Sequence, residues 1–487
     1  MKTKFRYLST VFFSFLVCIL LIITITWLFQ EPKEHEDFDL SISIEKRNNV
    51  YEKMIKEYRK RQKLLTIPKF GNFYQKRVET SHIDCGRVLR RDREYIRSIT
   101  ADNHRIPLIE DVDLDMDCEA VRLRIHPAEH LELKPLQHGI AFARIVYRDY
   151  EFVEKQVQVS FHPNNTFCFA VDKKAPDEFR SKMKRMGECI DNVIVLPGAL
   201  HYDSMGHNSN HAHYRCMEAA LQSPNWNYFI TQDNHDIVTK SVFELEKIFK
   251  IFGGANDIGV HEPFEGRWRD WYRMNPKSLK LFRNESEIDA KILNSEMNTT
   301  MGFKEASLSR AAVEWMVRTV DPMAFINQWN QSSYGGDEQW LSTFQANAQL
   351  GMPGHFTHEC VERGIAVDQV TRMTKWISKY DSLSGCSTRT LRHNLCVLGI
   401  EDLFSVASSP FLMFNKMLPS FDYSIVECTA ELLYNRTFLG QVDQELDENY
   451  YANMINVLYH KNHLEPSQDY RLNCTPSYKV WEYKALD

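Results

Sequence analysis

The sequence lacks both glycine-rich motifs that hold nucleotide phosphates with backbone amides. Neither a P-loop, GxxxxGK[ST], nor a GxGxxG fingerprint occurs in its 487 residues, so neither a kinase-like NTPase nor a Rossmann dehydrogenase is expected. A strongly basic region with interleaved aromatics is also missing, and the formal net charge is −6. The composition therefore gives no indication of a nucleic-acid partner. A nucleotide ligand would have to be held mainly by side chains.

A long uncharged apolar run occupies residues 11–29, and at about 1.5 Å per residue it crosses most of a bilayer core. Basic residues precede the run and acidic residues follow it, so the N-terminus should be cytosolic. Its bulky exit, Trp27–Phe29, does not suit a signal-peptide cleavage site. We predict a single-pass type II membrane protein, with a cytosolic tail (1–10), a transmembrane signal-anchor (11–29), a luminal stem (30–80) and a luminal domain (81–487).

Cysteines and glycosylation sequons agree with this topology. Of the 11 cysteines, Cys18 lies in the predicted span, which leaves an even number in the oxidising lumen, where disulfides form. Asn-x-Ser/Thr sequons, which can be glycosylated only in that setting, occur at Asn164, Asn284, Asn298, Asn330, Asn435 and Asn473.

Short apolar runs alternate with helix-period segments from about residue 138 onward. The runs predict strands at residues 140–147, 166–172, 192–197 and 227–231, and the intervening segments predict helices at 151–161, 176–189, 212–222 and 241–252. This alternation predicts an α/β fold with a mostly parallel sheet flanked by helices. Ligands of such sheets bind outside the carboxyl ends of the strands, where Asp172 and residues 232–236 fall.

Histidines and acidic residues between residues 201 and 236 form a first candidate constellation. Their composition would suit a metal site, but their spacing favours loop and capping roles. The segment 233–236 also lacks an Asp-x-Asp triplet, because its two aspartates are three positions apart. The residues concerned are His201, His207, His211, His213 and His235, with Asp203, Asp233 and Asp236.

Two further segments could carry chemistry. A glycine pair, Gly335 and Gly336, precedes Asp337 and Glu338 at the start of an apolar helix, where a carboxylate could act as a general base or could simply interact with the helix dipole. Cationic side chains at Arg392–His393 and Lys416 could neutralise a diphosphate, or could be ordinary surface charges.

Several segments taken together resemble the core 2/I-branching β-1,6-N-acetylglucosaminyltransferase family, glycosyltransferase family 14. The resemblance implies an inverting, metal-independent transferase with a GT-A-like fold, which needs no cofactor because the UDP-sugar is a substrate. The segments that carry the resemblance are 167–174, 226–230, 302–309, 337–338 and 396–416.

The resemblance also assigns roles to individual residues. Glu338 falls on the base that deprotonates the acceptor hydroxyl, and Asp172 on an acid that contacts the nucleoside. Lys416 matches one of two diphosphate-binding cations. The other falls on His393 by ungapped count, but we favour its neighbour Arg392 because a guanidinium stays charged at pH 7.

Acceptor positions and disulfides follow from the same resemblance. Arg267 and Trp376 match acceptor-binding residues, whereas Phe264 and Ser378 replace a lysine and a tyrosine, so the acceptor could differ. The implied bridges are Cys85 with Cys428, Cys118 with Cys189, Cys168 with Cys216, and Cys386 with Cys396. Cys360 and Cys474 are left as an extra bridge, free thiols or a link between subunits.

We therefore expect a Golgi membrane enzyme that transfers a sugar, N-acetylglucosamine by preference, from its UDP donor to a glycoprotein O-glycan and forms a β-1,6 branch. A homodimer is left open. One alternative is a non-catalytic glycan-binding type II membrane protein with a degenerate transferase fold. Another is a metal-dependent luminal hydrolase built on the histidines.

Overall fold

The computed structural model describes residues 74–475, except 102–103, 127–132, 199, 265, 268, 270, 378–384 and 442. A five-stranded sheet lies at the centre of this part of the chain, with strand order β3-β2-β1-β4-β6. Neighbouring strands run parallel except β6, which pairs antiparallel with β4. The strands are β1 (Gly139–Val146), β2 (Thr166–Val171), β3 (Val193–Leu196), β4 (Trp226–Gln232) and β6 (Ser307–Ser309).

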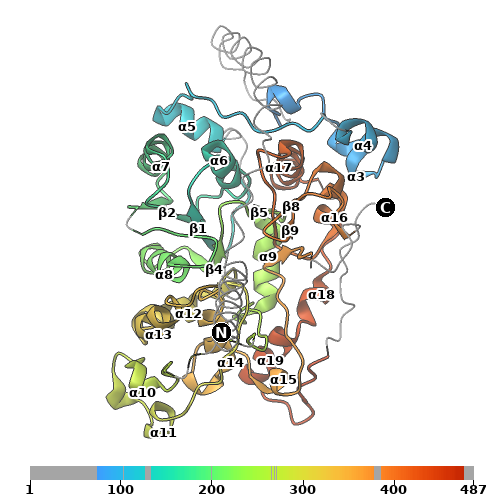
Figure 1. Cartoon of the computed structure of the whole chain (residues 1–487). Coiled ribbons are helices and arrows are strands. Elements are labelled where there is room, and N and C mark those ends of the chain that lie inside the picture. Colours follow the sequence, from blue (N-terminus) through green and yellow to red (C-terminus); the bar gives the residue numbers. More distant parts are fainter. Residues whose placement is uncertain are drawn as a thin grey trace, which may run out of the picture. The chain divides into compact units, whose positions relative to one another are not determined.

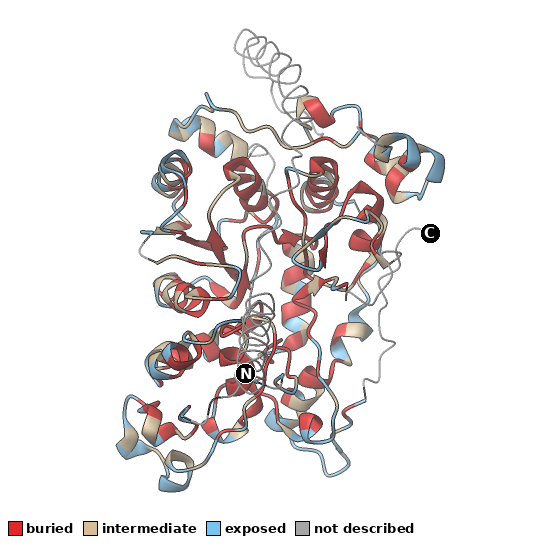
Figure 2. Cartoon of the chain, in the orientation of Figure 1, coloured by how far each residue is buried: buried red, intermediate tan, exposed pale blue. Residues whose placement is uncertain are grey.

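Helices cover both faces of this sheet (Figure 1). Alternate residues of β1 serve the two sides: Ile140 and Phe142 pack into the core beneath α6 (Tyr150–Val159) and α7 (Asp177–Cys189). Ala141 and Ala143 face the core beneath α8 (Ser209–Ala220) and α12 (Arg310–Arg318). β1 and β2 are accordingly buried on both faces, as Figure 2 shows, which is why their sequences read as continuous apolar runs.

A smaller sheet brings together three segments that lie far apart in the sequence. Its strands are β5 (Ile237–Val238), β10 (Met413–Asn415) and β7 (Arg372–Thr374), with β10 in the middle. Beside it, β8 (Leu391–Arg392) and β9 (Leu395–Cys396) form a hairpin. His393 and Asn394 have φ values of 51° and 62° in its two-residue turn, as a type I′ turn requires.

Further helices complete the described part of the chain. They are η1 (Val78–Thr80), α3 (Cys85–Leu89), α4 (Arg93–Thr100), α5 (Cys118–Ile125), α9 (Val242–Phe252), α10 (Pro276–Leu279), η2 (Glu285–Glu287), α11 (Ala290–Leu293), α13 (Met323–Trp329), α14 (Trp340–Ala346), η3 (Ala348–Leu350), α15 (Glu359–Glu362), η5 (Ile400–Asp402), α16 (Leu403–Ser408), α17 (Tyr423–Phe438), α18 (Glu448–Ala452) and α19 (Ile455–Leu464).

The mixed α/β architecture with a mainly parallel, helix-flanked sheet confirms the fold class expected from the sequence and fits a GT-A-like arrangement. Most predicted boundaries lie within two residues of the observed ones, but α8 begins at Ser209 rather than at residue 212, so His211, expected in the preceding loop, is helical. Asn208 precedes this helix with φ of 62° and makes no side-chain capping bond. The helix start therefore lacked the capping pattern that a sequence search relies on.

The predicted tail, the span at residues 11–29 and most of the stem lie outside the described residues. Within the described residues, no helix combines the length and the apolar character needed to cross a membrane.

Five disulfides link the described chain. Four are the pairs that the family resemblance implied: Cys85–Cys428, Cys118–Cys189, Cys168–Cys216 and Cys386–Cys396. The fifth joins Cys360 to Cys474, which answers the question left open for these two residues. This bridge fixes the segment after α19 to α15.

The sequons differ in how accessible their asparagines are. Asn284, Asn298 and Asn473 are exposed, as attachment of a glycan requires. Asn164 and Asn330 are half-buried, and their amide groups donate to the Leu136 carbonyl at 3.2 Å and to Asn208 Oδ1 at 3.1 Å. Asn435 is half-buried within α17.

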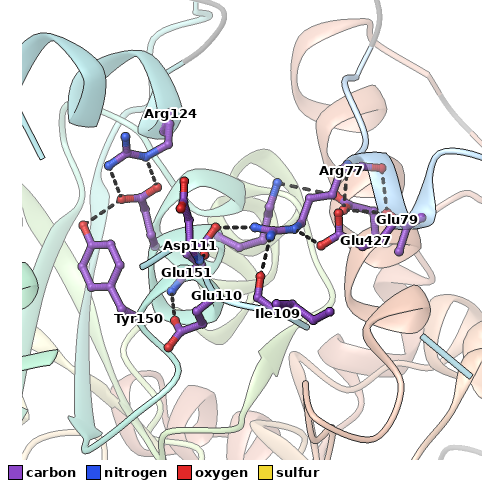
Figure 3. Close-up of polar contacts among 12 residues, drawn as sticks. Arg77, Glu79, Ile109, Glu110, Asp111, Arg124, Tyr150, Glu151 and Glu427 are labelled. Carbon is purple, nitrogen blue, oxygen red and sulfur yellow. Dashed lines mark hydrogen bonds and ion pairs between the residues drawn. The ribbon is translucent and has the colours of Figure 1, made fainter. Parts of the chain in front are cut away.

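Residues 74–80, at the end of the predicted stem, bind the domain through a largely buried polar network (Figure 3). The Arg77 guanidinium pairs with Glu79 at 2.6 Å, pairs with Glu151 of α6, and donates to the Ile109 carbonyl at 2.9 Å. The Arg77 amide donates to Glu427 of α17 at 3.1 Å. The segment thus bridges α6 and α17, so the end of the stem packs as part of the domain.

We predict that Arg77→Met lowers the free energy of unfolding by about 3 kcal/mol, because it leaves the carboxylates of Glu79 and Glu151 buried without their cation. Urea denaturation of the purified domain that begins before residue 74 measures this change. Arg87→Met is the control, since the Arg87–Asp92 pair is largely exposed. Equal effects of the two substitutions would contradict a structural role for the Arg77 network.

Candidate active site

The strand order places a topological switch point at the carboxyl ends of β1 and β4. From β1 the chain proceeds outward through β2 and β3, and then crosses back to β4 on the other side of β1. Ligands of open α/β sheets bind at such a point, so the site is expected at the carboxyl ends of these two strands. The two ends are tied together there: Asn234 Oδ1 accepts from the Tyr147 amide at 2.7 Å, and His235 Nε2 lies 2.6 Å from Asp149 Oδ2.

Asp172 follows the neighbouring strand β2 and lies at the same edge. It is only 5% exposed, and its carboxylate accepts from the backbone amides of Lys174 at 2.6 Å and Tyr202 at 2.9 Å. His201 Nδ1 approaches it at 3.3 Å. These contacts fix the carboxylate at the carboxyl end of the sheet, where the sequence placed it.

Glu338 lies in the turn that leads to α14. Because this helix begins at Trp340 and has no acidic residue in its first turn, a helix-dipole role does not account for Glu338. Its carboxylate pairs with the Arg267 guanidinium. Burial raises the pKa of Glu338, the charge of Arg267 opposes that rise, and the charge of Asp337 adds to it. A carboxylate with a raised pKa is a stronger base than an exposed one.

The turn geometry depends on glycine. Gly335 has φ of 64°, and a Cβ atom there would lie 2.6 Å from an Arg267 guanidinium nitrogen. The same guanidinium lies over the rings of Phe264 at 5.1 Å and Tyr334 at 5.4 Å. Arg267 is thereby held between two aromatic rings while it pairs with the carboxylate of Glu338.

Two further acceptor positions lie in the described residues, one next to the β8–β9 hairpin and one beside Arg267. Trp376 is 48% exposed and bridges to Leu395 of β9. Phe264 is 65% exposed, so an aromatic surface is available where the resemblance would place a lysine. Ser378 lies outside the described residues.

The cationic candidates come from the smaller sheet and the hairpin. Lys416 follows β10, and burial lowers its pKa to about 8; Asp233 opposes this shift, while the charges of Arg392 and Arg372 add to it. Arg392 is half-buried on β8, whereas His393 in the turn is exposed. The charge of Arg392 also acts on Tyr147, which directly follows β1.

A buried ion-pair network underlies these residues, and the sequence did not predict it. Arg372 lies 2.6 Å from Glu305, 3.4 Å from Asp236 and 3.7 Å from Asp233. The Lys304 ammonium lies 3.2 Å from both Asp233 and Asp337. No local motif marks Arg372 or Lys304, because their partners come from distant segments.

The histidines considered as metal ligands lie in separate contacts. His207 pairs with Asp203 at 2.7 Å, His211 contacts Asn327 at 2.7 Å, and His213 faces the Gln232 carbonyl at 3.4 Å. Among the described residues, one group has the proximity required of three metal ligands: Cys85, Cys428 and Glu431. Its two cysteines form a disulfide, so their sulfurs are not available as thiolates.

Carboxylates and cationic side chains thus lie around the carboxyl edge of the central sheet, where ligands of such sheets bind. The Core-2/I-branching enzyme family matches residues 140–407, which is more than half of the chain. The chain belongs to this family and is a glycosyltransferase.

The similar proteins are named as enzymes of one kind. A "beta-1,3-galactosyl-O-glycosyl-glycoprotein beta-1,6-N-acetylglucosaminyltransferase" from bovine herpesvirus 4 is 24% identical over 74% of this chain and 84% of its own length. Enzymes of the same name with the suffix 3 from Bos taurus and Homo sapiens are also 24% identical, over 74% of this chain and 83% and 84% of their lengths. These names favour an enzyme over a non-catalytic glycan-binding protein.

We predict that Gly206→Ala disrupts the turn that carries Glu338. Gly206 has φ of 94°, and a Cβ atom there would lie 2.1 Å from Asp337 Oδ1. The substitution should lower both the free energy of unfolding, measured in urea, and the rate of sugar transfer.

Gly364→Ala is the matched control, because Gly364 also has a positive φ, 72°, but has open space around it. It should cost about 1–2 kcal/mol from backbone strain alone and should leave transfer intact. If the two variants behave alike, the contact between Gly206 and Asp337 does not matter.

Proposed function

We propose that the protein transfers N-acetylglucosamine from its UDP donor to a hydroxyl of a glycoprotein O-glycan and forms a β-1,6 branch. The arrangement that best supports this function is a series of charged neighbours that connects the proposed base, Glu338, with the proposed diphosphate-binding cation Lys416. Asp337 pairs with Lys304, Lys304 pairs with Asp233, and the charge of Asp233 acts on Lys416. The names of the similar enzymes supply the sugar and the linkage.

In this mechanism Glu338 removes the proton from the acceptor hydroxyl as the oxygen attacks the anomeric carbon. The bond from that carbon to the UDP oxygen breaks on the opposite side, so the configuration at the anomeric carbon inverts. Arg267, which already contacts Glu338, and the exposed Trp376 would position the acceptor. The raised pKa of Glu338 supports this role, since a buried carboxylate accepts the proton more readily.

Arg392 and Lys416 would stabilise the negative charge that develops on the departing diphosphate. Fixed cations in a partly buried site are worth more than cations in water, because solvent screens them less. The half-buried position of Arg392 and the effect of its charge on Lys416 favour it over the exposed His393. With the leaving group held in this way, the reaction needs no metal ion. Asp172 would accept a hydrogen bond from the nucleoside.

We also propose that the enzyme acts in the Golgi lumen as a type II membrane protein. The five disulfides fit an oxidising compartment, and three of the sequons are exposed. The anchor predicted at residues 11–29 would hold the domain where glycoproteins pass.

The Glu338→Gln substitution tests the base. Because glutamine keeps the shape of the side chain but cannot accept the proton, kcat for transfer should fall by about 10²–10⁴-fold while the KM for the UDP-sugar changes little. Glu178→Gln on α7 is the control, since its side chain is 62% exposed. Near-wild-type transfer by purified Glu338→Gln would exclude this mechanism.

The pH dependence tests Lys416. Its pKa is lowered to about 8. The side chain is therefore charged below that pH and loses its charge as the pH rises through about 8. We expect kcat/KM for the UDP-sugar to fall as the pH rises through about 8. In Lys416→Arg this alkaline decline should move to higher pH, because a guanidinium stays protonated. A decline at the same pH in both proteins would assign it to another group.

A further inference from the structure

The ammonium group of Lys304 lies next to three side-chain oxygen atoms close to the candidate site. The Lys304 Nζ atom lies 3.2 Å from Asp233 Oδ1, 3.2 Å from Asp337 Oδ2 and 3.3 Å from the Ser209 hydroxyl. An ammonium has three donors, and each has an acceptor here. The lysine side chain is 14% exposed, so solvent screens these charges only partly.

The backbone around Lys304 is fixed on two sides. The Thr231 hydroxyl of β4 donates to the Lys304 carbonyl at 2.7 Å, and the Gly302 amide donates to the Glu338 carbonyl at 2.9 Å. The segment that carries Lys304 is therefore hydrogen-bonded both to β4 and to the turn that contains Glu338.

The two carboxylates that Lys304 joins have different neighbours. Asp337 directly precedes Glu338 and is 7% exposed. Asp233 follows β4, is 33% exposed and also lies near Arg372. Burial would lower the pKa of Lys304, but the charges of Asp233, Asp337 and Glu305 raise it well above its usual value. Lys304 thus stays charged at any pH at which the enzyme works.

We propose that Lys304 is a positioning residue that serves as a built-in cation, holding the carboxylates of Asp233 and Asp337 together and so fixing the turn that carries Glu338. Two carboxylates and a hydroxyl are an all-oxygen set that a hard divalent cation would also accept. The lysine fills that place with a covalently attached charge. The inference rests on the proposed role of Glu338 but concerns a different residue and a different measurement.

The test uses the luminal domain with Lys304→Ala, Lys304→Arg and, as a control, Lys184→Ala, whose side chain is 78% exposed. Sugar transfer is measured in EDTA and in Mn²⁺. Binding of Mn²⁺ is measured separately by the loss of the free-ion EPR signal, which needs no turnover. Circular dichroism checks that each variant is folded.

We expect Lys304→Ala to lose about 100-fold in kcat in EDTA, as a misplaced base would, to bind Mn²⁺, and to regain transfer when Mn²⁺ is added. Wild type and Lys184→Ala should show neither Mn²⁺ binding at this place nor stimulation by Mn²⁺. Lys304→Arg should retain more transfer than Lys304→Ala in EDTA, since it keeps the charge.

Unchanged transfer by Lys304→Ala in EDTA would overturn the proposal, as would a loss of transfer without Mn²⁺ binding. If Lys304→Ala does not fold, Asp337→Asn replaces it. That variant should lower kcat without raising the KM for the UDP-sugar, and an unchanged kcat would overturn the proposal.

The outcome separates this proposal from the proposed function. If Glu338→Gln keeps its activity, the base is wrong, while Mn²⁺ binding by Lys304→Ala still decides whether Lys304 occupies a cation position.

Discussion

The ion pairs of the buried Arg372 guanidinium hold the segments of the candidate site together. Arg372 comes from β7 of the smaller sheet and reaches Asp236 and Asp233 at the end of β4, as well as Glu305 just before β6. Asn415 of β10 binds Asp236 at 2.8 Å from the same side. One cation therefore joins the two sheets at the edge where a ligand would bind. Without it, several carboxylates would lie together in a poorly solvated place.

This constraint explains how acidic and basic groups coexist at the sheet edge. The carboxylates near Arg372 and Lys304 are paired with cations of the protein itself, so in the proposed mechanism Lys416 and Arg392 are left to bind the diphosphate. Burial and mutual repulsion make Lys416 a weaker base than a free lysine, so a bound diphosphate would relieve an unfavourable charge arrangement. For Glu338 the pKa moves the other way, because burial raises it and so favours the protonated form. In the proposed mechanism Glu338 becomes protonated, which its burial favours, whereas Lys416 stays charged and gains a counter-charge from the diphosphate.

Much of the fold could be predicted from local patterns. The strands and helices between residues 139 and 252 follow from apolar periodicity, and Asp172 and Glu338 are marked by a strand end and a glycine turn. Arg372, Lys304 and the Cys360–Cys474 bridge could not be found in this way, since their partners lie in other segments and only the folded chain brings them together. The start of α8 was misplaced for a local reason: Asn208 adopts a left-handed conformation instead of capping the helix.

The stereochemistry of the product tests the central claim most directly, because a base that activates the acceptor for in-line attack must invert the anomeric carbon. NMR of the first product formed from an α-linked UDP-N-acetylglucosamine and an O-glycan acceptor reports that configuration through its anomeric coupling constant. The account predicts a β-linked product. An α-linked product would contradict it and would require a different role for Glu338.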